Sequence, residues 1–299
     1  MASSTLNSNP IFTPGFFRRL QQLKIQTRRS YLGSRQGAHI SKRRGHGLEF
    51  SDYRTYVPGD DFRHIDWGVY GRTDRLYVKE FREEQELQVL FLVDTSQSMA
   101  YPLGEGKFEL AKNLAISLGY VALADGDTAV LSFLGKELSP KYVGVRALPR
   151  LIELGKRITA TDQLSLEQEV RKSLGRIRLP GKCFLISDLL MPIDDIVAAC
   201  EQVCAKNFEL SVIQVLAPGE IDLVSGDSQS VLVDSESGES IELSLTSGLA
   251  QDYKKVLARH IQDIERYTLS REIGYALVSS GDTIQQVVLN TLPELGILR

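Results

Sequence analysis

The chain contains 299 residues, 42% of them apolar and 24% charged, a composition typical of a soluble globular protein with one or two domains. No early segment resembles a signal peptide, and no apolar run is long enough to span a membrane, so we predict a cytoplasmic protein without a membrane span. The three cysteines have no histidine nearby, which argues against a zinc site and for buried, reduced thiols.

Residues 1–46 are predicted to form a basic, partly disordered arm. Residues 1–50 carry nine Lys and Arg against one acidic residue, whereas the rest of the chain carries 26 basic and 37 acidic residues. Residues 16–25 have apolar positions near helical spacing, which predicts a short helix. Such an arm can bind nucleic acid or an anionic surface, dock on an acidic partner, or lie on the protein's own acidic surface. Nucleic-acid binding is disfavoured because the arm has few aromatic residues for base stacking.

Residues 47–86 form a second segment, dense in aromatic residues, Arg and Asp. Alternation over Leu76–Phe81 predicts a strand, and the segment is expected to be a small loop-and-strand subdomain. Its acidic residues and one histidine invite a nuclease or hydrolase interpretation: Asp60, Asp61, His64 and Asp66. We expect instead that the carboxylates pair with nearby arginines, namely Arg54, Arg63, Arg72 and Arg75.

From residue 87 to residue 299 the pattern alternates between strands and helices. Strands are predicted at 87–93, 128–134, 182–187, 208–216 and 273–279, and helices at 107–124, 147–158, 164–174, 193–206, 250–267 and 283–292. Residues 220–245 interrupt this rhythm with two β-like pieces, which predicts a β-hairpin insertion. The alternation predicts an α/β fold with a mainly parallel sheet flanked by helices on both faces.

The predicted strand Leu87–Val93 is an almost unbroken apolar run that suits burial on both faces. It ends in Asp94-Thr95-Ser96-Gln97-Ser98, which places three oxygen-bearing side chains, those of Asp94, Ser96 and Ser98, on the loop after its carboxyl end. One carboxylate with two hydroxyls suits Mg²⁺ or Mn²⁺ better than zinc. The alternative is an ordinary helix N-cap, a role that Ser and Asp fill well.

Neighbouring strand ends offer the remaining ligands of such a site. Asp188 follows the predicted strand Lys182–Ser187, and Thr161 lies in a loop just before a predicted helix. Ligands of open α/β sheets lie outside the carboxyl ends of the strands. The predicted metal ligands are therefore Asp94, Ser96, Ser98, Thr161 and Asp188, with Mg²⁺ or Mn²⁺ as the cofactor and no catalytic residue assigned.

This D-x-S-x-S loop, followed by a later strand that ends in Asp, resembles the metal-ion-dependent adhesion site of von Willebrand factor A domains. The resemblance runs from about Leu87 to the C-terminus, and Thr161 and Asp188 match by placement. It implies a von Willebrand factor A-like, Rossmann-like fold over residues 87–299. It also implies a protein-interaction site at which an Asp or Glu of a partner completes the metal's coordination.

The preceding segment carries a more specific resemblance. The sequence RTYVPGDDFRHIDW, followed by GRTDRLYVKEF, resembles the signature of a prokaryotic family, the domain of unknown function fifty-eight. The two resemblances together cover about residues 47–299. Members of that family typically accompany MoxR-type AAA+ ATPases. The resemblance therefore implies a non-enzymatic adaptor or chaperone-like partner of such an ATPase, or a protein that binds the ATPase's client.

Two other functions remain open from the sequence. A metal-dependent hydrolase would use Asp94 and Asp188, and nucleic-acid or anionic-surface binding would use the basic arm. An aspartyl phosphatase, which would start from a similar strand-end Asp, is disfavoured because the position two residues after Asp94, where its general acid is expected, is Ser96. ATP binding is also disfavoured, because the Gly104–Lys107 stretch lacks the spacing of a phosphate-binding loop.

Overall fold

The computed structural model describes residues 12–28, 48–83, 87–102, 104, 106–160, 164–177, 181–222, 229–233, 240–244 and 247–299. The chain divides into two units. One comprises Met1–Arg29 together with Leu87–Arg299, and the other comprises Ser30–Glu86. No helix of the described residues is long and apolar enough to cross a membrane.

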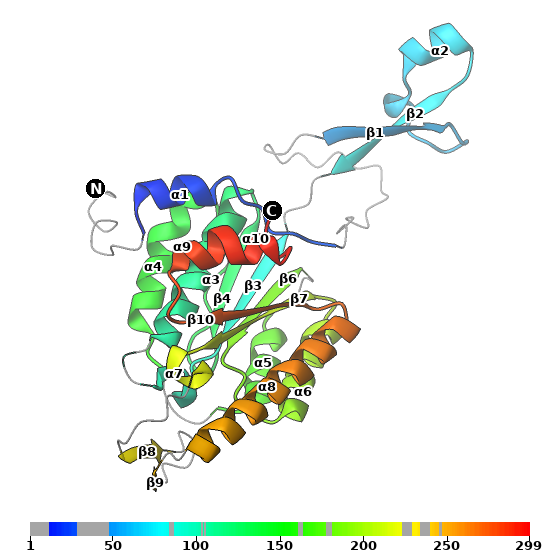
Figure 1. Cartoon of the computed structure of the whole chain (residues 1–299). Coiled ribbons are helices and arrows are strands. Elements are labelled where there is room, and N and C mark those ends of the chain that lie inside the picture. The colour runs from blue at the N-terminus through cyan, green and yellow to red at the C-terminus, as the bar shows by residue number, and fades with distance from the viewer. Residues whose placement is uncertain are drawn as a thin grey trace. The chain divides into compact units, whose positions relative to one another are not determined.

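The larger unit is organised around a six-stranded sheet (Figure 1). Its strands are β3 (Gln88–Val93), β4 (Thr128–Phe133), β5 (Tyr142–Val143), β6 (Lys182–Ser187), β7 (Glu209–Leu216) and β10 (Gly274–Ser279). All neighbouring pairs are parallel except β4 and β5, which are antiparallel. Every residue of β3, β4 and β6 is buried, as their continuous apolar runs require in a sheet covered on both faces. The predicted mainly parallel sheet is confirmed.

The strand order creates one topological switch point. The order across the sheet is β10-β7-β6-β3-β4-β5. Counted along the chain within this sheet, the order corresponds to 3-2-1-4-5-6, that of a doubly wound α/β fold. The chain leaves β3 for one side of the sheet and later returns to β6 on the other. Asp94 and Asp188 follow these two strands, so both lie at the switch point.

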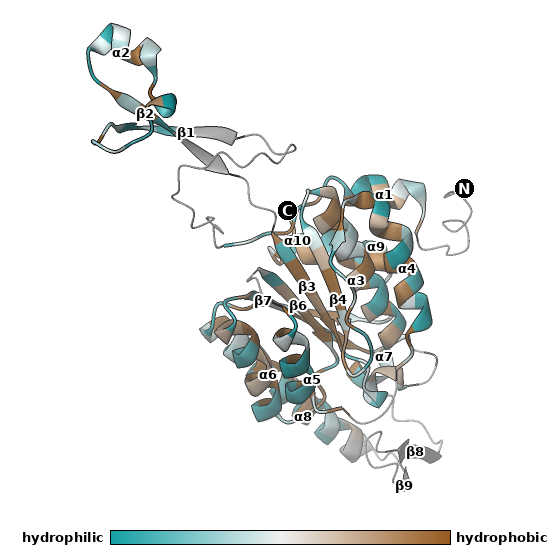
Figure 2. Cartoon of the chain, turned by 180° about the vertical axis from the view of Figure 1, so that it is seen from behind, coloured by the Kyte–Doolittle hydropathy of each residue, from teal (hydrophilic) through white to brown (hydrophobic). Residues whose placement is uncertain are grey.

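Helices cover both faces of this sheet. One hydrophobic cluster joins the sheet to α3 (Lys107–Ala124), α4 (Leu148–Arg157), α9 (Ile284–Gln286), the π-helical turn Val287–Thr291 and α10 (Leu292–Glu294). A second cluster joins the other face to α5 (Leu166–Gly175), α6 (Ile193–Ala205) and α8 (Ser247–Ser270). Figure 2 shows the apolar strands between helices that turn polar faces outward. The predicted helices at 107–124 and 193–206 agree with α3 and α6 to within one residue.

Short elements complete this unit. They are the 3₁₀ turns Gln97–Ala100 and Val145–Ala147, the short helix α7 (Pro218–Ile221), and the strands β8 (Gln229–Val233) and β9 (Ser240–Ser244). β8 and β9 pair antiparallel, the arrangement predicted for residues 220–245. The short edge strand β5 was not predicted, because two residues leave no periodic pattern.

Part of the basic arm lies on this unit. Helix α1 (Pro14–Leu20) is capped by the Thr13 hydroxyl and buries Phe16, Phe17 and Leu20 in the first hydrophobic cluster. The chain then pairs with the C-terminus through two backbone hydrogen bonds between Lys24 and Arg299, of 2.8 and 3.0 Å. Residues 12–28 therefore lie on the protein itself, but the helix packs through apolar side chains and not on an acidic surface as the third interpretation had it. Residues 29–47 fall outside the described part of the chain.

The smaller unit is built on a two-stranded antiparallel sheet. Strand β1 (Leu48–Thr55) pairs with β2 (Tyr77–Glu83), and the connection contains the 3₁₀ turn Phe62–His64 and helix α2 (Trp67–Thr73). Strand β2 agrees with the predicted strand. Helix α2 was not predicted, because its sequence WGVYGRT contains two glycines and no helical apolar period. Its start is determined by Asp66, whose side chain accepts hydrogen bonds from the amides of Gly68 and Val69.

A substitution at Gly181, just before β6, tests how closely β6 packs against β3. A Cβ atom at this position would lie 1.9 Å from the backbone carbonyl oxygen of Gln88, and a backbone atom cannot move aside as a side chain can. We expect Gly181→Ala to lower the free energy of unfolding by about 3 kcal/mol, the upper end of the range for overpacked sites. Urea unfolding measures the change. Gly175→Ala is the matched control, because a Cβ there meets no atom within 4 Å. Equal stability of the two variants would contradict this packing.

Candidate functional site

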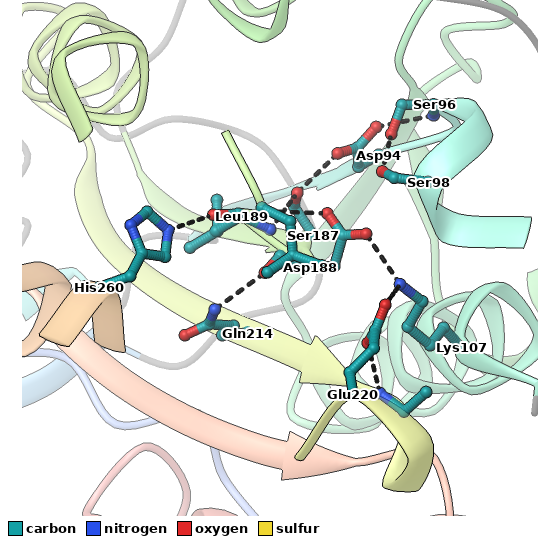
Figure 3. Close-up of polar contacts among 12 residues, drawn as sticks. Asp94, Ser96, Ser98, Lys107, Ser187, Asp188, Leu189, Gln214, Glu220 and His260 are labelled. Atoms are coloured by element: carbon teal, nitrogen blue, oxygen red, sulfur yellow. Dashed lines mark hydrogen bonds and ion pairs between the residues drawn. The ribbon is translucent and has the colours of Figure 1, made fainter. Parts of the chain in front are cut away.

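Two buried carboxylates lie near each other at the switch point (Figure 3). Asp94 follows β3 and Asp188 follows β6, and their exposed fractions are 2% and 0%. The backbone amide of Asp94 donates to the carbonyl oxygen of Ile186 at 2.9 Å, which ties the first loop to the neighbouring strand. Burial raises the pKa of Asp94, and the nearby charge of Asp188 raises it further. Both effects disfavour the ionised form of Asp94, because little water is present to screen its charge.

The loop that follows β3, residues 94–98, forms hydrogen bonds around the Asp94 carboxylate. The Ser96 amide donates to Asp94 Oδ1 at 2.8 Å, and the hydroxyls of Ser96 and Ser98 lie 3.0 Å apart. Both serines are half-buried, so this side of the site is accessible. Ser96 precedes the 3₁₀ turn Gln97–Ala100, but its side chain makes no capping hydrogen bond. The helix-cap alternative therefore does not account for the Ser96 hydroxyl.

A hydrogen-bond relay positions the backbone beside Asp188. The Ser187 hydroxyl donates to Asp94 Oδ2 at 2.6 Å and accepts from the Leu189 amide at 3.0 Å. Leu189 is buried with a φ of +53°, a left-handed conformation that non-glycine residues seldom adopt. Gln214 Nε2 donates to the carbonyl oxygen of Asp188 at 2.8 Å. His260 Nε2 lies 2.7 Å from the carbonyl oxygen of Leu189. Since a carbonyl oxygen can only accept, Nε2 of His260 carries a proton.

A buried lysine completes the cluster. The ammonium of Lys107, in the first turn of α3, lies 2.9 Å from Asp188 Oδ2 and 2.5 Å from Glu220 Oε1. The Lys107 side chain is only 1% exposed. Glu220 lies on α7, after the carboxyl end of β7, and its second oxygen accepts from the Ala217 amide at 2.7 Å. Burial raises the pKa of Glu220, and the charge of Lys107 opposes that shift.

The charges of this cluster do not balance. With all groups ionised, three carboxylates, those of Asp94, Asp188 and Glu220, face the single ammonium of Lys107, which leaves two negative charges. The donors at the Asp94 side are all oxygens, which suits Mg²⁺ or Mn²⁺. Within the described residues, no three His, Cys, Asp or Glu side chains converge on one metal position. A cation held here would therefore depend on the Ser96 and Ser98 hydroxyls and on water.

The structure brings together four of the five predicted ligands, those at 94, 96, 98 and 188. Thr161 lies outside the described residues. The sequence did not predict the roles of Ser187, Lys107, Gln214, Glu220 and His260. Ser187 could have been suspected, because it immediately precedes Asp188 at a strand end. The other four gave no signal, because they belong to helices and strands that come together only in the fold.

The three aspartates that invited a catalytic interpretation, Asp60, Asp61 and Asp66, each have a basic partner within the smaller unit. Arg54 forms two hydrogen bonds of 2.9 Å to the Asp60 carboxylate. Arg63 Nε lies 3.9 Å from Asp61 Oδ1. Asp66 pairs with Lys79 at 3.0 Å and accepts from the Tyr53 hydroxyl at 2.8 Å.

The expected arginine pairing is thus present at Asp60 and Asp61, but the cation at Asp66 is a lysine. Arg72 instead donates to the Gly68 carbonyl oxygen. These contacts favour structural roles for the carboxylates of this unit over a catalytic one.

Comparison with family models matches residues 52–263 to the family described as "Protein of unknown function DUF58". The chain belongs to the DUF58 family. The predicted membership is thereby confirmed, and the match spans both the signature segment and most of the six-stranded sheet. This DUF58 protein is 29% identical over 263 residues to Rv1480 of Mycobacterium tuberculosis and to Mb1516 of Mycobacterium bovis. The alignment covers 83% of this chain and 79% of each relative.

Other similarities are shorter or more remote. YeaD of Bacillus subtilis is 30% identical over 92 residues, which cover 31% of this chain and 21% of YeaD. Among solved structures, BatB from Bacteroides thetaiotaomicron has a TM-score of 0.43 at 17% identity. An aerotolerance-related membrane protein from Bacteroides fragilis has a TM-score of 0.40 at 18% identity. Each alignment covers 70% of this chain and 98% of the other.

The hydroxyl of Ser187 should contribute measurably to stability. Ser187→Ala removes a donor to Asp94 and an acceptor for the Leu189 amide, both in a buried setting. We expect a loss of about 1–3 kcal/mol in the free energy of unfolding, the cost of leaving such groups unpaired. Ser211→Ala on β7 is the matched control, because that buried hydroxyl has no hydrogen-bond partner among the described residues. A Ser187→Ala variant as stable as the control would contradict the relay.

The cap of helix α2 should titrate at low pH. Hydrogen bonds from Tyr53, then from Lys79, lower the pKa of Asp66 to about 2. A pKa below the ordinary value of 3.8 means that this carboxylate stabilises the fold above about pH 4. The contribution is lost as the pH falls towards 2. Carboxyl-carbon NMR measures the titration directly. Tyr53→Phe should raise the pKa of Asp66, and an unchanged value would show that the phenol does not hold this carboxylate.

Proposed function

We propose that this DUF58 protein is a non-enzymatic docking module, whose switch-point site binds a protein partner with the help of Mg²⁺ or Mn²⁺. The observation that carries the proposal is the pair of buried carboxylates at 94 and 188, beside two accessible serine hydroxyls. The Ser96 and Ser98 hydroxyls would hold the cation directly, with Thr161 as a further ligand, and the two carboxylates would act on it through water. The strand order supports a von Willebrand factor A-like arrangement of residues 87–299, in which a site at this position serves recognition.

The accessibility of the site favours binding over hydrolysis. A general acid or base must reach the substrate, yet Asp94 and Asp188 are almost fully buried. Each is also occupied by donors: Asp94 by Ser187 and the Ser96 amide, and Asp188 by Lys107. The groups that remain accessible are the hydroxyls of Ser96 and Ser98, which are neutral. We therefore favour recognition over the alternative of a hydrolase that uses the two aspartates.

The charge of the site indicates what the partner presents. A bound divalent cation would supply a positive centre that the neutral hydroxyls leave only partly offset, so it would attract a carboxylate from outside. The matching partner group is an exposed Asp or Glu side chain. The family resemblance points to an AAA+ ATPase of the MoxR type, or that ATPase's client, as the protein that carries it. This partner assignment rests on the resemblance alone.

The proposal is tested by capturing a purified MoxR-type ATPase on the immobilised full chain. We expect capture of the ATPase with about 10 mM Mg²⁺. With EDTA the captured amount should fall at least about tenfold, because the cation bridges the two proteins. The Ser96→Ala/Ser98→Ala variant should show the EDTA level of capture even with Mg²⁺. Ser270→Ala, an exposed serine at the end of α8, is the control and should behave as the wild type.

Two outcomes would contradict the docking proposal. One is capture that is equally strong with EDTA. The other is capture that survives loss of both serine hydroxyls. A circular dichroism melt of the double variant accompanies the experiment, because a fold that has lost its integrity would also lose the partner.

A further inference from the structure

Lys107 is an unusual residue to find beside a cation site. Its side chain is 1% exposed, and it lies in the first turn of α3 after Gly106. A buried ammonium is costly unless carboxylates pair with it. Lys107 has two such partners, Asp188 at the end of β6 and Glu220 on α7. The fold thus brings one fixed positive charge to the place where a cation would bind.

The ammonium lies next to the candidate site without filling it. In Figure 3, Lys107 approaches Asp188 from the side of Glu220, and the hydroxyls of Ser96 and Ser98 lie on the other side of Asp188 near Asp94. Among the described residues, the ion-pair partners of Lys107 are Asp188 and Glu220. Lys107 therefore shares one predicted metal ligand, Asp188, and leaves the serine side open.

We propose that Lys107 lowers the affinity of the site for a divalent cation, so that lasting retention of the cation requires the partner's carboxylate. This inference rests on the proposed function and adds its regulation. Lys107 acts in two ways. Its ammonium occupies Asp188 Oδ2, and its positive charge repels the divalent cation in a setting with little water. Glu220 moderates both effects, because it draws part of the ammonium's interaction away from Asp188.

Two variants separate this role from a purely structural one. Lys107→Met/Glu220→Gln removes one positive and one negative charge, so the total charge of the four groups is unchanged while Asp188 loses its counter-ion. Among the described residues, Glu220→Gln alone leaves the ammonium with Asp188 as its one charged partner, and it makes the cluster one unit less negative. The glutamine carbonyl can still accept the Ala217 amide hydrogen bond that Glu220 accepts in the wild type.

The experiment is titration of the full chain with Mn²⁺ alone, followed by electron paramagnetic resonance of the free ion. We expect Lys107→Met/Glu220→Gln to bind Mn²⁺ at least about tenfold more tightly than the wild type, because Asp188 loses its counter-ion and its carboxylate then acts on the metal unopposed at low dielectric. We expect Glu220→Gln alone to bind more weakly than the wild type. Thermal melts without metal show that each variant is folded.

The outcomes separate this inference from the docking proposal. Opposite shifts in the two variants support the role of Lys107, as does Mn²⁺ binding that becomes detectable only in the double variant. If the wild type binds Mn²⁺ through Ser96 and Ser98 but the double variant has unchanged affinity, the inference on Lys107 is wrong and the docking proposal stands. If no folded variant binds Mn²⁺, both are wrong.

Discussion

Two carboxylates buried at the ends of adjacent parallel strands impose the main electrostatic constraint on the larger unit. Asp94 and Asp188 have almost no contact with water, so their mutual repulsion is poorly screened. The surrounding structure supplies donors from several elements: the Ser96 amide, the Ser187 hydroxyl and the Lys107 ammonium. Much of the polar architecture at this edge of the sheet follows from the need to hold these two charges.

The same constraint connects distant parts of the chain. Lys107 and Glu220 are 113 residues apart in sequence, yet their side chains form a direct ion pair at the carboxyl edge of the sheet. His260, on the long helix α8, reaches the carbonyl oxygen of Leu189, whose left-handed backbone directly follows Asp188. Each of these elements is therefore connected to the backbone or the side chain of Asp188 through few contacts. This connectivity fixes the geometry of the strand-end carboxylate.

The site also illustrates why charge balance is more informative than ligand spacing. A D-x-S-x-S loop on its own is compatible with a simple turn, and the Asx-type bond from the Ser96 amide to Asp94 would occur in either case. With all groups ionised, the excess of negative charge, together with oxygen donors and two half-buried hydroxyls, would suit the hard cation that we propose. The internal ammonium of Lys107 shows that the fold itself already offsets part of that excess.

Much of the fold could be predicted from local pattern. The continuous apolar runs at β3, β4 and β6 are buried on both faces, and runs of that length identify strands of a covered parallel sheet. Helix α3 begins and ends where its sequence predicts. The strand-end positions of Asp94 and Asp188 followed from the same patterns, because a parallel sheet brings the carboxyl ends of its strands to one edge.

What the sequence by itself determined was thus the α/β class and the carboxylate and serine positions at the strand ends. The tertiary structure alone decided that Lys107 and Glu220 join them, that α1 covers the first hydrophobic cluster, and that Lys79 rather than an arginine pairs with Asp66. The physical reason is that sequence patterns report only on residues close together in the chain. Periodicity records which side of an element is buried, whereas the partner of a buried charge depends on the order of strands and on where each helix returns to the sheet.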